Sequence, residues 1–355
     1  MPSVLVAMSG GVDSSVAACL LREQGYEVLG SHMRLIHLDG VDHGCCGPSA
    51  RRDAAEVARV GGFPFEVCDL TDEFRRAVLD DFASEHEAGR TPNPCARCNG
   101  EIKFGAFLRR ADALGIDFVA SGHYVRTDRV GARWRLLRGA DRAKDQSYML
   151  HMLGQRALAR SLFPVGELEK TETRALAERF GLPVATKPDS QELCFAPAGD
   201  AGAYARAALP HLVRGGQVVD DAGRELARHD GTFGFTIGQR RGTGVVAGER
   251  RYVVDLDADA NRVVVGPGEL LARRGLVADD VSWVAGRRPS EGRFEAEVRI
   301  RSRGEDVPCV VEADGPDRVR LEFGMPQRAV APGQRAVLFR GDEVLGGGRI
   351  VEALR

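Results

Sequence analysis

Over the first 200 residues, short apolar runs alternate with longer stretches in which apolar residues recur at three- or four-residue spacing. This alternation predicts strands and helices in turn, and therefore an α/β domain over residues 1–200 with a doubly wound parallel sheet. The expected strands are Val4–Ala7, Glu27–Ser31, Phe65–Asp69 and Phe118–Ser121. The expected helices are Ser14–Gln24, Arg51–Val60, Phe74–His86 and Ile102–Leu114.

After about residue 200 the pattern changes to short β-like runs with frequent glycine. It predicts a small linking domain over residues 201–275, with strands such as Tyr252–Leu256 and Val263–Val265. In residues 276–355, short runs alternate with turns at a spacing typical of a C-terminal all-β barrel. Its expected strands are Arg293–Ser302, Cys309–Glu312, Arg318–Phe323, Ala336–Phe339 and Glu343–Val351.

Residues 8–15, with the sequence MSGGVDSS, lie between the first expected strand and the first expected helix. A strand, a glycine-rich turn and a helix in this order direct backbone N–H groups and the positive helix end at an anion. Gly10 and Gly11 permit the close approach that a phosphate requires. The GxxxxGK[ST] pattern of kinases and GTPases is absent, and we expect Asp13 to bind Mg²⁺. The alternative is an ordinary glycine-rich turn capped by Asp13 or Ser14.

Ligands of parallel sheets bind at the carboxyl ends of the strands. Met33 and Gly122 each follow an expected strand, so we expect them at the same edge as the MSGGVDSS loop. There they would line an adenosine pocket. The alternative is a methionine that fills the core and a glycine that simply ends a strand.

Length, composition and charge limit the kinds of protein that this chain can be. The chain has 355 residues, which predicts two or three domains, and a formal charge of -2, so any nucleic-acid contact must come from local basic patches. Only four of its 49 basic residues are lysines, and two of these, Lys103 and Lys144, lie in the motifs below. No 18-residue apolar run and no signal-peptide pattern is present, and we expect a cytoplasmic protein without membrane contact.

The sequence TPNPCARCN forms a second expected loop, in which two prolines fix the backbone and Asn99 caps the next helix. Cys98 would then lie at a helix N-terminus, which stabilises the nucleophilic thiolate, and Lys103 lies one turn further on. A single CxxC pattern also fits a zinc half-site, a redox pair or an iron–sulfur half-site. No second CxxC exists to complete a zinc site, so we assign no metal there. The adjacent Cys45 and Cys46 are left unassigned.

Residues 126–142 contain six arginines and two aspartates in a hairpin-like run with a turn at Val130-Gly131. Such a run fits RNA phosphates, or alternatively a solvated arginine face.

Six motifs together resemble the tRNA-specific 2-thiouridylase family of PP-loop ATP pyrophosphatases. They are TPNPCARCNGEIKF, ASGHYVR, KDQSYML, KPDSQELCF, FTIGQRRGTG and PGQRAVLF, which follow the MSGGVDSS loop in this order along nearly the whole chain. The resemblance implies a tRNA 2-thiouridine synthase that uses ATP with Mg²⁺, adenylates the C2 oxygen of the wobble uridine and inserts persulfide sulfur. Its partners would be tRNA and a persulfide donor, such as a cysteine desulfurase or relay protein.

The resemblance also assigns residues. Cys98 would be the nucleophile and Cys194 the persulfide carrier. The ATP site would comprise Ala7, Met8, Ser9, Gly10, Gly11, Val12, Asp13, Ser14, Met33 and Gly122. The tRNA site would comprise Asn93, Pro94, Cys95, His123, Lys144, Asp145, Gln146, Arg301, Ser302 and Gln334.

Two sulfur routes stay open. Cys98 attacks the Cys194 persulfide, releasing sulfide and leaving a disulfide, or the persulfide attacks the activated uridine directly. Cys95 stands where many family members carry Asp, so a general-acid role for that carboxylate is lost. Ser302 likewise replaces an aromatic residue found in some relatives. Cys95, Cys98 and Cys194 also allow a second hypothesis, a [4Fe-4S] cluster with one open iron.

Two rival functions remain. A PP-loop enzyme acting on a small molecule would share the ATP loop but would need neither the two cysteines nor the barrel. An RNA-binding module without catalysis would not need the ATP loop.

Overall fold

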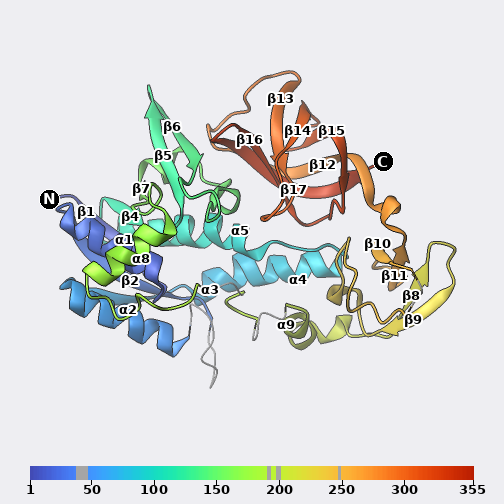
Figure 1. The fold of residues 1–355 in the computed structure, drawn as a ribbon, viewed down its shortest axis with the longest axis horizontal. Coiled ribbons are helices and arrows are strands. Elements are labelled where there is room, and N and C mark those ends of the chain that lie inside the picture. Colours follow the sequence, from blue (N-terminus) through green and yellow to red (C-terminus); the bar gives the residue numbers. More distant parts are fainter. Residues whose placement is uncertain (37–46, 190–192, 197–200, 247–248) are drawn as a thin grey trace.

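The computed structural model describes residues 1–36, 47–189, 193–196, 201–246 and 249–355. The N-terminal part is built on a five-stranded parallel sheet in the order β3-β2-β1-β4-β7 (Figure 1). The strands are β1 Ser3–Ala7, β2 Glu27–Arg34, β3 Phe65–Asp69, β4 Phe118–Ala120 and β7 Ser161–Leu162. The four predicted strands are confirmed, and the short β7 was missed.

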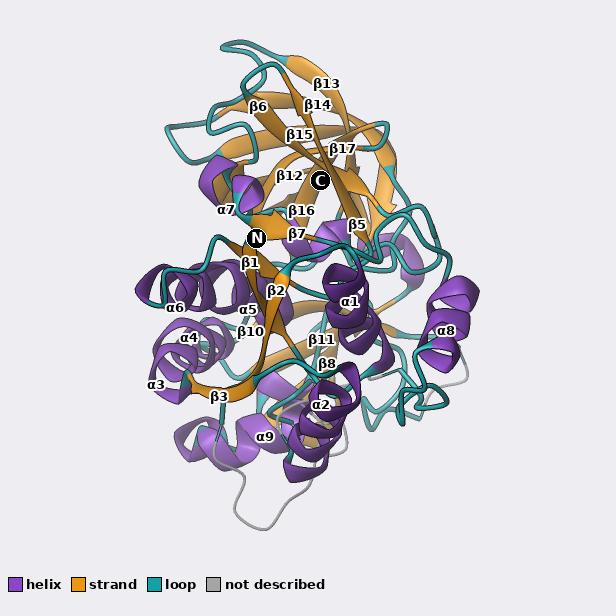
Figure 2. Ribbon diagram, turned by 90° about the vertical axis from the view of Figure 1, so that its left-hand side faces the viewer, coloured by secondary structure: helices purple, strands orange, loops and turns teal. Residues whose placement is uncertain are grey.

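Helices cover both faces of this sheet, as Figure 2 shows. Side chains alternate along β1, so Val4 and Val6 pack in one buried cluster and Leu5 and Ala7 in another. The first face carries α1 Val12–Glu23, α2 Pro48–Gly61 and α8 Lys170–Arg179. The second carries α3 Thr71–Phe74, a π-helix Arg75–Leu79, α4 Asp80–Glu87, α5 Pro94–Cys98, a π-helix Asn99–Ala106 and α6 Phe107–Ala113. The doubly wound prediction is confirmed.

A four-stranded sheet follows, in the order β10-β11-β8-β9, over its own small apolar cluster. Its strands are β8 Gly216–Asp220, β9 Glu225–His229, β10 Tyr252–Asp257 and β11 Arg262–Gly266. Helix α9 Ala201–Ala208 precedes it. Short 3-10 turns occupy Pro210–Leu212, Thr232–Gly234 and Gly268–Leu271.

The C-terminal part is a six-stranded antiparallel barrel closed by the pairing of β12 with β17. Its strands are β12 Ala272–Trp283, β13 Phe294–Arg299, β14 Val307–Ala313, β15 Val319–Arg328, β16 Arg335–Arg340 and β17 Glu343–Leu354. The sequence analysis missed β12, whose polar residues 279, 280 and 282 interrupt the apolar pattern.

The predicted arginine-rich hairpin exists as β5 Val125–Val130 and β6 Arg133–Arg138, with Gly131 in the left-handed region at φ 61°. Strand β6 pairs with β17 at Leu136 and Leu137, so the hairpin extends the barrel sheet. A 3-10 turn Ser147–Leu150 and helix α7 Gln155–Ala159 lie between the hairpin and β7.

Five of the six arginines of residues 126–142 make ion pairs with carboxylates, most of them in neighbouring segments. Arg126 and Arg142 both bind Asp342 in the β16–β17 turn, and Arg135 binds Asp128. The others are Arg133 with Glu343 and Arg138 with Asp306. Within the described residues these arginines therefore bind carboxylates, and Arg129 alone has no such partner.

His151 is fully buried, and its Nδ1 lies 2.9 Å from the carbonyl oxygen of Tyr148. Burial, with a smaller contribution from the Arg335 charge, lowers its pKa from 6.5 to about 3. Below pH 6.5 the unfolded chain therefore binds a proton at His151, whereas the folded chain binds this proton only below about pH 3. We expect the free energy of unfolding to fall by up to about 1.4 kcal/mol per pH unit from this group between those values. Unfolding midpoints of wild type and His151→Gln at pH 7 and 5 measure it, and equal pH slopes would contradict it.

Candidate active site

The MSGGVDSS loop is shaped by contacts of its glycines. Gly10 has φ 69°, and a Cβ there would lie 2.2 Å from the carbonyl oxygen of Ala50 in α2. Only glycine fits this position without strain. The Ser14 hydroxyl accepts a hydrogen bond from the backbone N–H of Ser9 at 3.2 Å, and the Ser15 hydroxyl donates to the Gly11 carbonyl at 2.8 Å. These bonds fix the loop at the start of α1.

A cavity of about 310 Å³ lies at the carboxyl ends of β1, β2 and β4. It brings together most of the predicted ATP residues with several predicted tRNA residues. The lining comprises Ala7, Met8, Ser9, Gly11, Val12, Asp13, Ser14, Met33, Leu35, Lys103, Ser121, Gly122, His123, Tyr124, Lys144, Gln146, Pro188 and Asp189. Gly10 does not line it, and its carbonyl instead accepts a hydrogen bond from Lys187 Nζ at 3.0 Å.

Gly122 lies where the end of β4 meets the start of α1. A Cβ at this position would lie 2.4 Å from the backbone nitrogen of Ser14 and 2.5 Å from the carbonyl carbon of Asp13. No larger residue fits without moving backbone. Glycine here therefore lets β4 press directly against the loop and form one wall of the cavity.

The Asp13 carboxylate has one oxygen engaged and one available. Oδ1 accepts hydrogen bonds from the Tyr124 hydroxyl at 2.8 Å and from Lys170 Nζ at 2.6 Å. Oδ2 has no hydrogen-bond partner among the described residues. Mg²⁺ in nucleotide sites is bound by one or two carboxylates together with substrate phosphates and water. An oriented carboxylate with one open oxygen, facing a phosphate-sized cavity, fits that requirement.

Lys170 and Asp189 were missed by the sequence analysis, although the composition contained a signal. Each of the four lysines lies at this site: Lys103 and Lys144 line the cavity, Lys170 binds Asp13 and Lys187 binds the loop carbonyl. Asp189 accepts from Lys144 and Lys170, each at 2.8 Å. Partial burial would raise the pKa of Asp189, but these bonds outweigh it and lower the pKa to about 2.

His123 is held as a neutral imidazole. Burial and then the Lys103 charge lower its pKa well below 6.5, and its Nδ1 lies 2.8 Å from the Ser121 hydroxyl. At neutral pH this ring offers hydrogen-bonding groups and its ring face to the cavity, and it adds no charge.

The helix around Cys98 differs from the prediction. It begins at Pro94, and the Asn93 side chain caps it by accepting a hydrogen bond from the Ala96 N–H at 3.1 Å. Helical structure continues through Ala113, so Asn99 lies inside it and donates to the Met149 carbonyl at 3.2 Å. The predicted cap at Asn99 is therefore wrong, because Pro94 starts the helix five residues earlier. Cys98 lies at the end of the first turn and is buried.

Cys98 and Cys194 belong to the same apolar cluster, with Cys98 in its buried part and the half-buried Cys194 packed against it. Both are thiols in this structure, as is Cys95. No three His, Cys, Asp or Glu side chains of the described residues are grouped to hold a metal ion. The three cysteines therefore do not fit a [4Fe-4S] cluster in this arrangement. Cys45 and Cys46, and residues 190–192 of the KPDSQELCF motif, lie outside the described residues.

The other predicted tRNA residues have diverse environments. Asp145 is turned into the protein, where its carboxylate accepts hydrogen bonds from Gly139 N–H and the Ser147 hydroxyl. Gln146 accepts from Tyr124 N–H at 2.9 Å. Gln334 donates to the Thr91 carbonyl at 3.0 Å and so joins the barrel to the TPNPC loop. The exposed Arg301 donates to the Arg328 carbonyl at 2.7 Å, and Ser302 beside it is exposed.

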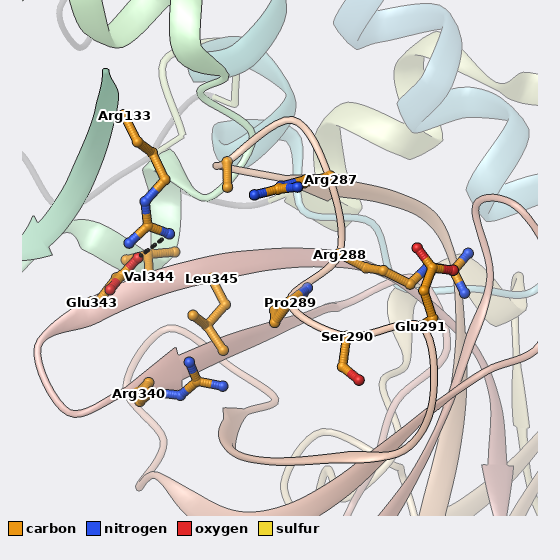
Figure 3. Close-up of a pocket in the computed structure, with 11 residues that line it drawn as sticks. Arg133, Arg287, Arg288, Pro289, Ser290, Glu291, Arg340, Glu343, Val344 and Leu345 are labelled. Atoms are coloured by element: carbon orange, nitrogen blue, oxygen red, sulfur yellow. Dashed lines mark ion pairs between the residues drawn. The ribbon is translucent and has the colours of Figure 1, made fainter. Parts of the chain in front are cut away.

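A second cavity, of about 470 Å³, lies between the hairpin and the barrel. Figure 3 shows the guanidinium groups of Arg133, Arg287 and Arg340 around Pro289 and Leu345. Arg133 pairs with Glu343 at 3.0 Å, whereas Arg287 and Arg340 have no ion-pair partner within the described residues. The remaining lining residues are Ala285, Arg288, Ser290, Glu291 and Val344.

Comparison with known proteins agrees with this architecture. Residues 2–198 match the tRNA methyl transferase HUP domain, residues 210–267 the tRNA methyl transferase PRC-barrel domain, and residues 273–350 the aminomethyltransferase beta-barrel domain. The chain is 45% identical to the tRNA-specific 2-thiouridylase MnmA of Symbiobacterium thermophilum, covering 99% of this chain and 92% of that protein. The chain belongs to the tRNA-specific 2-thiouridylase family.

Two further 2-thiouridylases give the same result. The chain is 46% identical to MnmA of Geobacter metallireducens and 47% identical to MnmA of Chloroflexus aggregans. Each match covers 99% of this chain, with 97% and 98% of the respective relatives. As for membranes, none of the helices within the described residues combines the length and apolar character needed to span one.

Proposed function

We propose that this protein is a tRNA-uridine 2-sulfurtransferase. It adenylates the C2 oxygen of the wobble uridine of tRNA with ATP, releases pyrophosphate, and replaces AMP by sulfur from a cysteine persulfide. The observation that carries the proposal is the full-length similarity to 2-thiouridylases combined with the single cavity that the ATP-loop residues and Lys144 share. A [4Fe-4S]-dependent thiolation on this scaffold lacks support, because the described cysteines form no metal-binding group.

ATP would bind in the 310 Å³ cavity. The backbone N–H groups at the start of α1 and the Ser9 and Ser14 hydroxyls would bind the phosphates, with Met33 and Gly122 beside the adenosine. Asp13 would hold Mg²⁺ through its open oxygen, and the ion, when bound, neutralises charge on the phosphates. Tyr124 and Lys170 bind Asp13 Oδ1 and so keep Oδ2 directed at the cavity.

Sulfur would reach the site through Cys194. A persulfide donor protein needs an accessible thiol, and Cys194 is half-buried whereas Cys98 is only 7% exposed. Cys98 thiolate then attacks the Cys194 sulfur, which forms a disulfide and releases hydrosulfide. Hydrosulfide attacks uridine C2 and AMP leaves. In the alternative route the terminal persulfide sulfur attacks C2 itself and AMP leaves. A thiol later reduces the S–S bond that joins Cys194 to the new uridine sulfur.

The target uridine would lie beside the capped start of α5, where Asn93, Pro94 and Cys95 are near Cys98 in sequence and Gln334 fixes the loop. Lys144 and Gln146 would contact the anticodon loop from the cavity side, with Asp145 shaping that segment through its internal bonds. Arg301 and Ser302 would contact RNA from the exposed face of the barrel.

The groove at Arg133, Arg287 and Arg340 would bind backbone phosphates away from the wobble base. Guanidinium groups bind phosphate oxygens in pairs, and Arg287 and Arg340 do not have to break an ion pair first. Arg133 in the same groove, like Arg126 and Arg135 elsewhere in the hairpin, is paired with a carboxylate, so Arg287 and Arg340 are the stronger candidates for phosphate binding.

An Arg287→Ala/Arg340→Ala variant should bind tRNA about tenfold more weakly and lower the slope of log Kd against log salt by about 2, one for each phosphate contact. The turnover rate at saturating tRNA should not change. Titration of labelled tRNA at several salt concentrations measures this. Arg76→Ala, which removes an exposed arginine of the π-helix Arg75–Leu79 that does not line the groove, is the control. If the slope of log Kd against log salt equals that of wild type, the groove is a solvated arginine surface that does not bind tRNA phosphates.

Pyrophosphate release tests the function as a whole. We expect release only when tRNA carrying an uridine at the wobble position is present, followed by 2-thiouridine when a persulfide donor is added. Release with a small-molecule acceptor would favour the rival PP-loop enzyme. Binding of RNA without any release would favour an RNA-binding module.

A further inference from the structure

Asp189 holds three cations at the edge of the ATP cavity. Its Oδ2 accepts from Lys144 Nζ at 2.8 Å, and its Oδ1 accepts from Lys170 Nζ at 2.8 Å and from Arg174 at 3.3 Å. Lys170 is the first residue of α8, and its backbone N–H is fixed by the Asp141 carboxylate at 3.1 Å. The ammonium group of Lys170 is thus held in place between two carboxylates.

The second of those carboxylates is Asp13, at 2.6 Å from Lys170 Nζ. Lys144, Asp189, Lys170 and Asp13 therefore form an unbroken chain of alternating charges. One end is the proposed tRNA contact and the other is the proposed Mg²⁺ ligand. No step of the reaction described above uses Asp189.

We propose that Asp189 is a positioning residue that makes tRNA binding and Mg·ATP binding cooperative. The proposal rests on the proposed function, since it takes Lys144 as an RNA contact and Asp13 as the Mg²⁺ ligand. An RNA phosphate that binds Lys144 removes one cation from Asp189. Asp189 then attracts Lys170 more strongly, and Asp13 is less neutralised and binds Mg²⁺ more tightly.

The chemistry of lysine suits this role. An ammonium group is a compact charge that two carboxylates can share in changing proportion, whereas a guanidinium group binds one carboxylate in a fixed two-pronged geometry. In a chain with 45 arginines and only four lysines, two of the four are the cations of this charge chain. Asp189, whose pKa is held near 2, stays ionised at working pH.

The test measures the Kd of α,β-methylene-ATP with Mg²⁺, with and without saturating tRNA. In wild type we expect tRNA to lower this Kd about tenfold, within the usual range of allosteric coupling. In Asp189→Asn the two values should agree within twofold. Asp53→Asn is the matched control, because it removes the carboxylate 2.6 Å from Lys187, a lysine of the same site outside the charge chain. It should keep the tenfold effect.

A second variant tests the proposal even if Asp189→Asn fails to fold. Lys144→Met without tRNA should bind the analogue about as tightly as tRNA-saturated wild type, since it removes the same cation. A tenfold effect retained in Asp189→Asn, no effect in wild type, or Lys144→Met binding like free wild type would overturn the proposal. If wild type released no pyrophosphate with tRNA, the proposed function itself would fail. Normal pyrophosphate release by wild type, together with a tenfold tRNA effect that Asp189→Asn retains, would reject only the role of Asp189.

Discussion

Replacing Asp13 by Asn should lower the rate of tRNA-dependent pyrophosphate release by about three orders of magnitude and leave tRNA affinity, measured without nucleotide, within about twofold. The change keeps the size of the side chain and an oxygen for Tyr124 and Lys170, but it removes the charge that a divalent ion requires. Loss of several kcal/mol of stabilisation of the separating phosphates corresponds to such a factor. Quench-flow measurement of pyrophosphate gives the rate, and titration of labelled tRNA without nucleotide gives the affinity.

Asp53→Asn controls for the loss of a carboxylate near the same loop, because Asp53 binds Lys187 and does not line the cavity. It should release pyrophosphate at close to the wild-type rate. Release by Asp13→Asn at the wild-type rate would remove Asp13 from the ATP site. A loss of tRNA affinity measured without nucleotide would mean that the variant had disturbed the loop as a whole.

The sheet and its loop were predictable because their signals are local. A buried strand, two glycines and a helix adjoin in residues 3–23, and β3 was predicted with both ends correct. Met33 and Gly122 were placed at the cavity by one topological rule, that parallel strands share a carboxyl edge. These inferences need no knowledge of distant contacts.

Long-range charge pairs were not predictable in the same way. Lys170 lies 157 residues from Asp13, and no sequence period connects them. The hairpin shows the same limit, because the six arginines of residues 126–142 suggested RNA contact, while two of their ion-pair partners, Asp342 and Glu343, lie about 200 residues away. The rarity of lysine in this chain was a usable signal, since all four lysines gather at one site.

The start of α5 was misplaced for a local reason. Asn93 and Asn99 are both of a residue type that caps helices well, and the cap was predicted at Asn99 because the expected helix began at Ile102. Pro94 at the first helical position decides for Asn93, and the resulting cap contributes about 1 kcal/mol. Strand β12 was missed because a register shift between Asp279 and Ser282 in its pairing with β17, with Asp280 at φ 49°, interrupts the strand pattern at its polar positions.

The two cysteines should separate by role when a persulfide donor carries radiolabelled sulfur. Cys194→Ser should accept no transferable label and form no 2-thiouridine. Cys98→Ser should still accept label on Cys194, because a donor protein reaches the half-buried Cys194 without needing the buried Cys98. Both variants should bind ATP and tRNA normally, since neither thiol lines the ATP cavity. Cys309→Ala, a buried cysteine of the barrel core, is the control and should behave like wild type.

Product formation by Cys98→Ser then distinguishes the two sulfur routes. If hydrosulfide is released by disulfide formation, this variant holds labelled Cys194 persulfide and forms almost no 2-thiouridine. If the persulfide attacks uridine directly, it forms product, and only the final reduction needs an external thiol. The first route also requires the two Cα atoms to come within about 7 Å during the cycle, so mass spectrometry should find a Cys98–Cys194 disulfide after one turnover without reductant. Wild-type turnover by Cys194→Ser, or loss of all label from Cys98→Ser, would show that the roles are wrongly assigned.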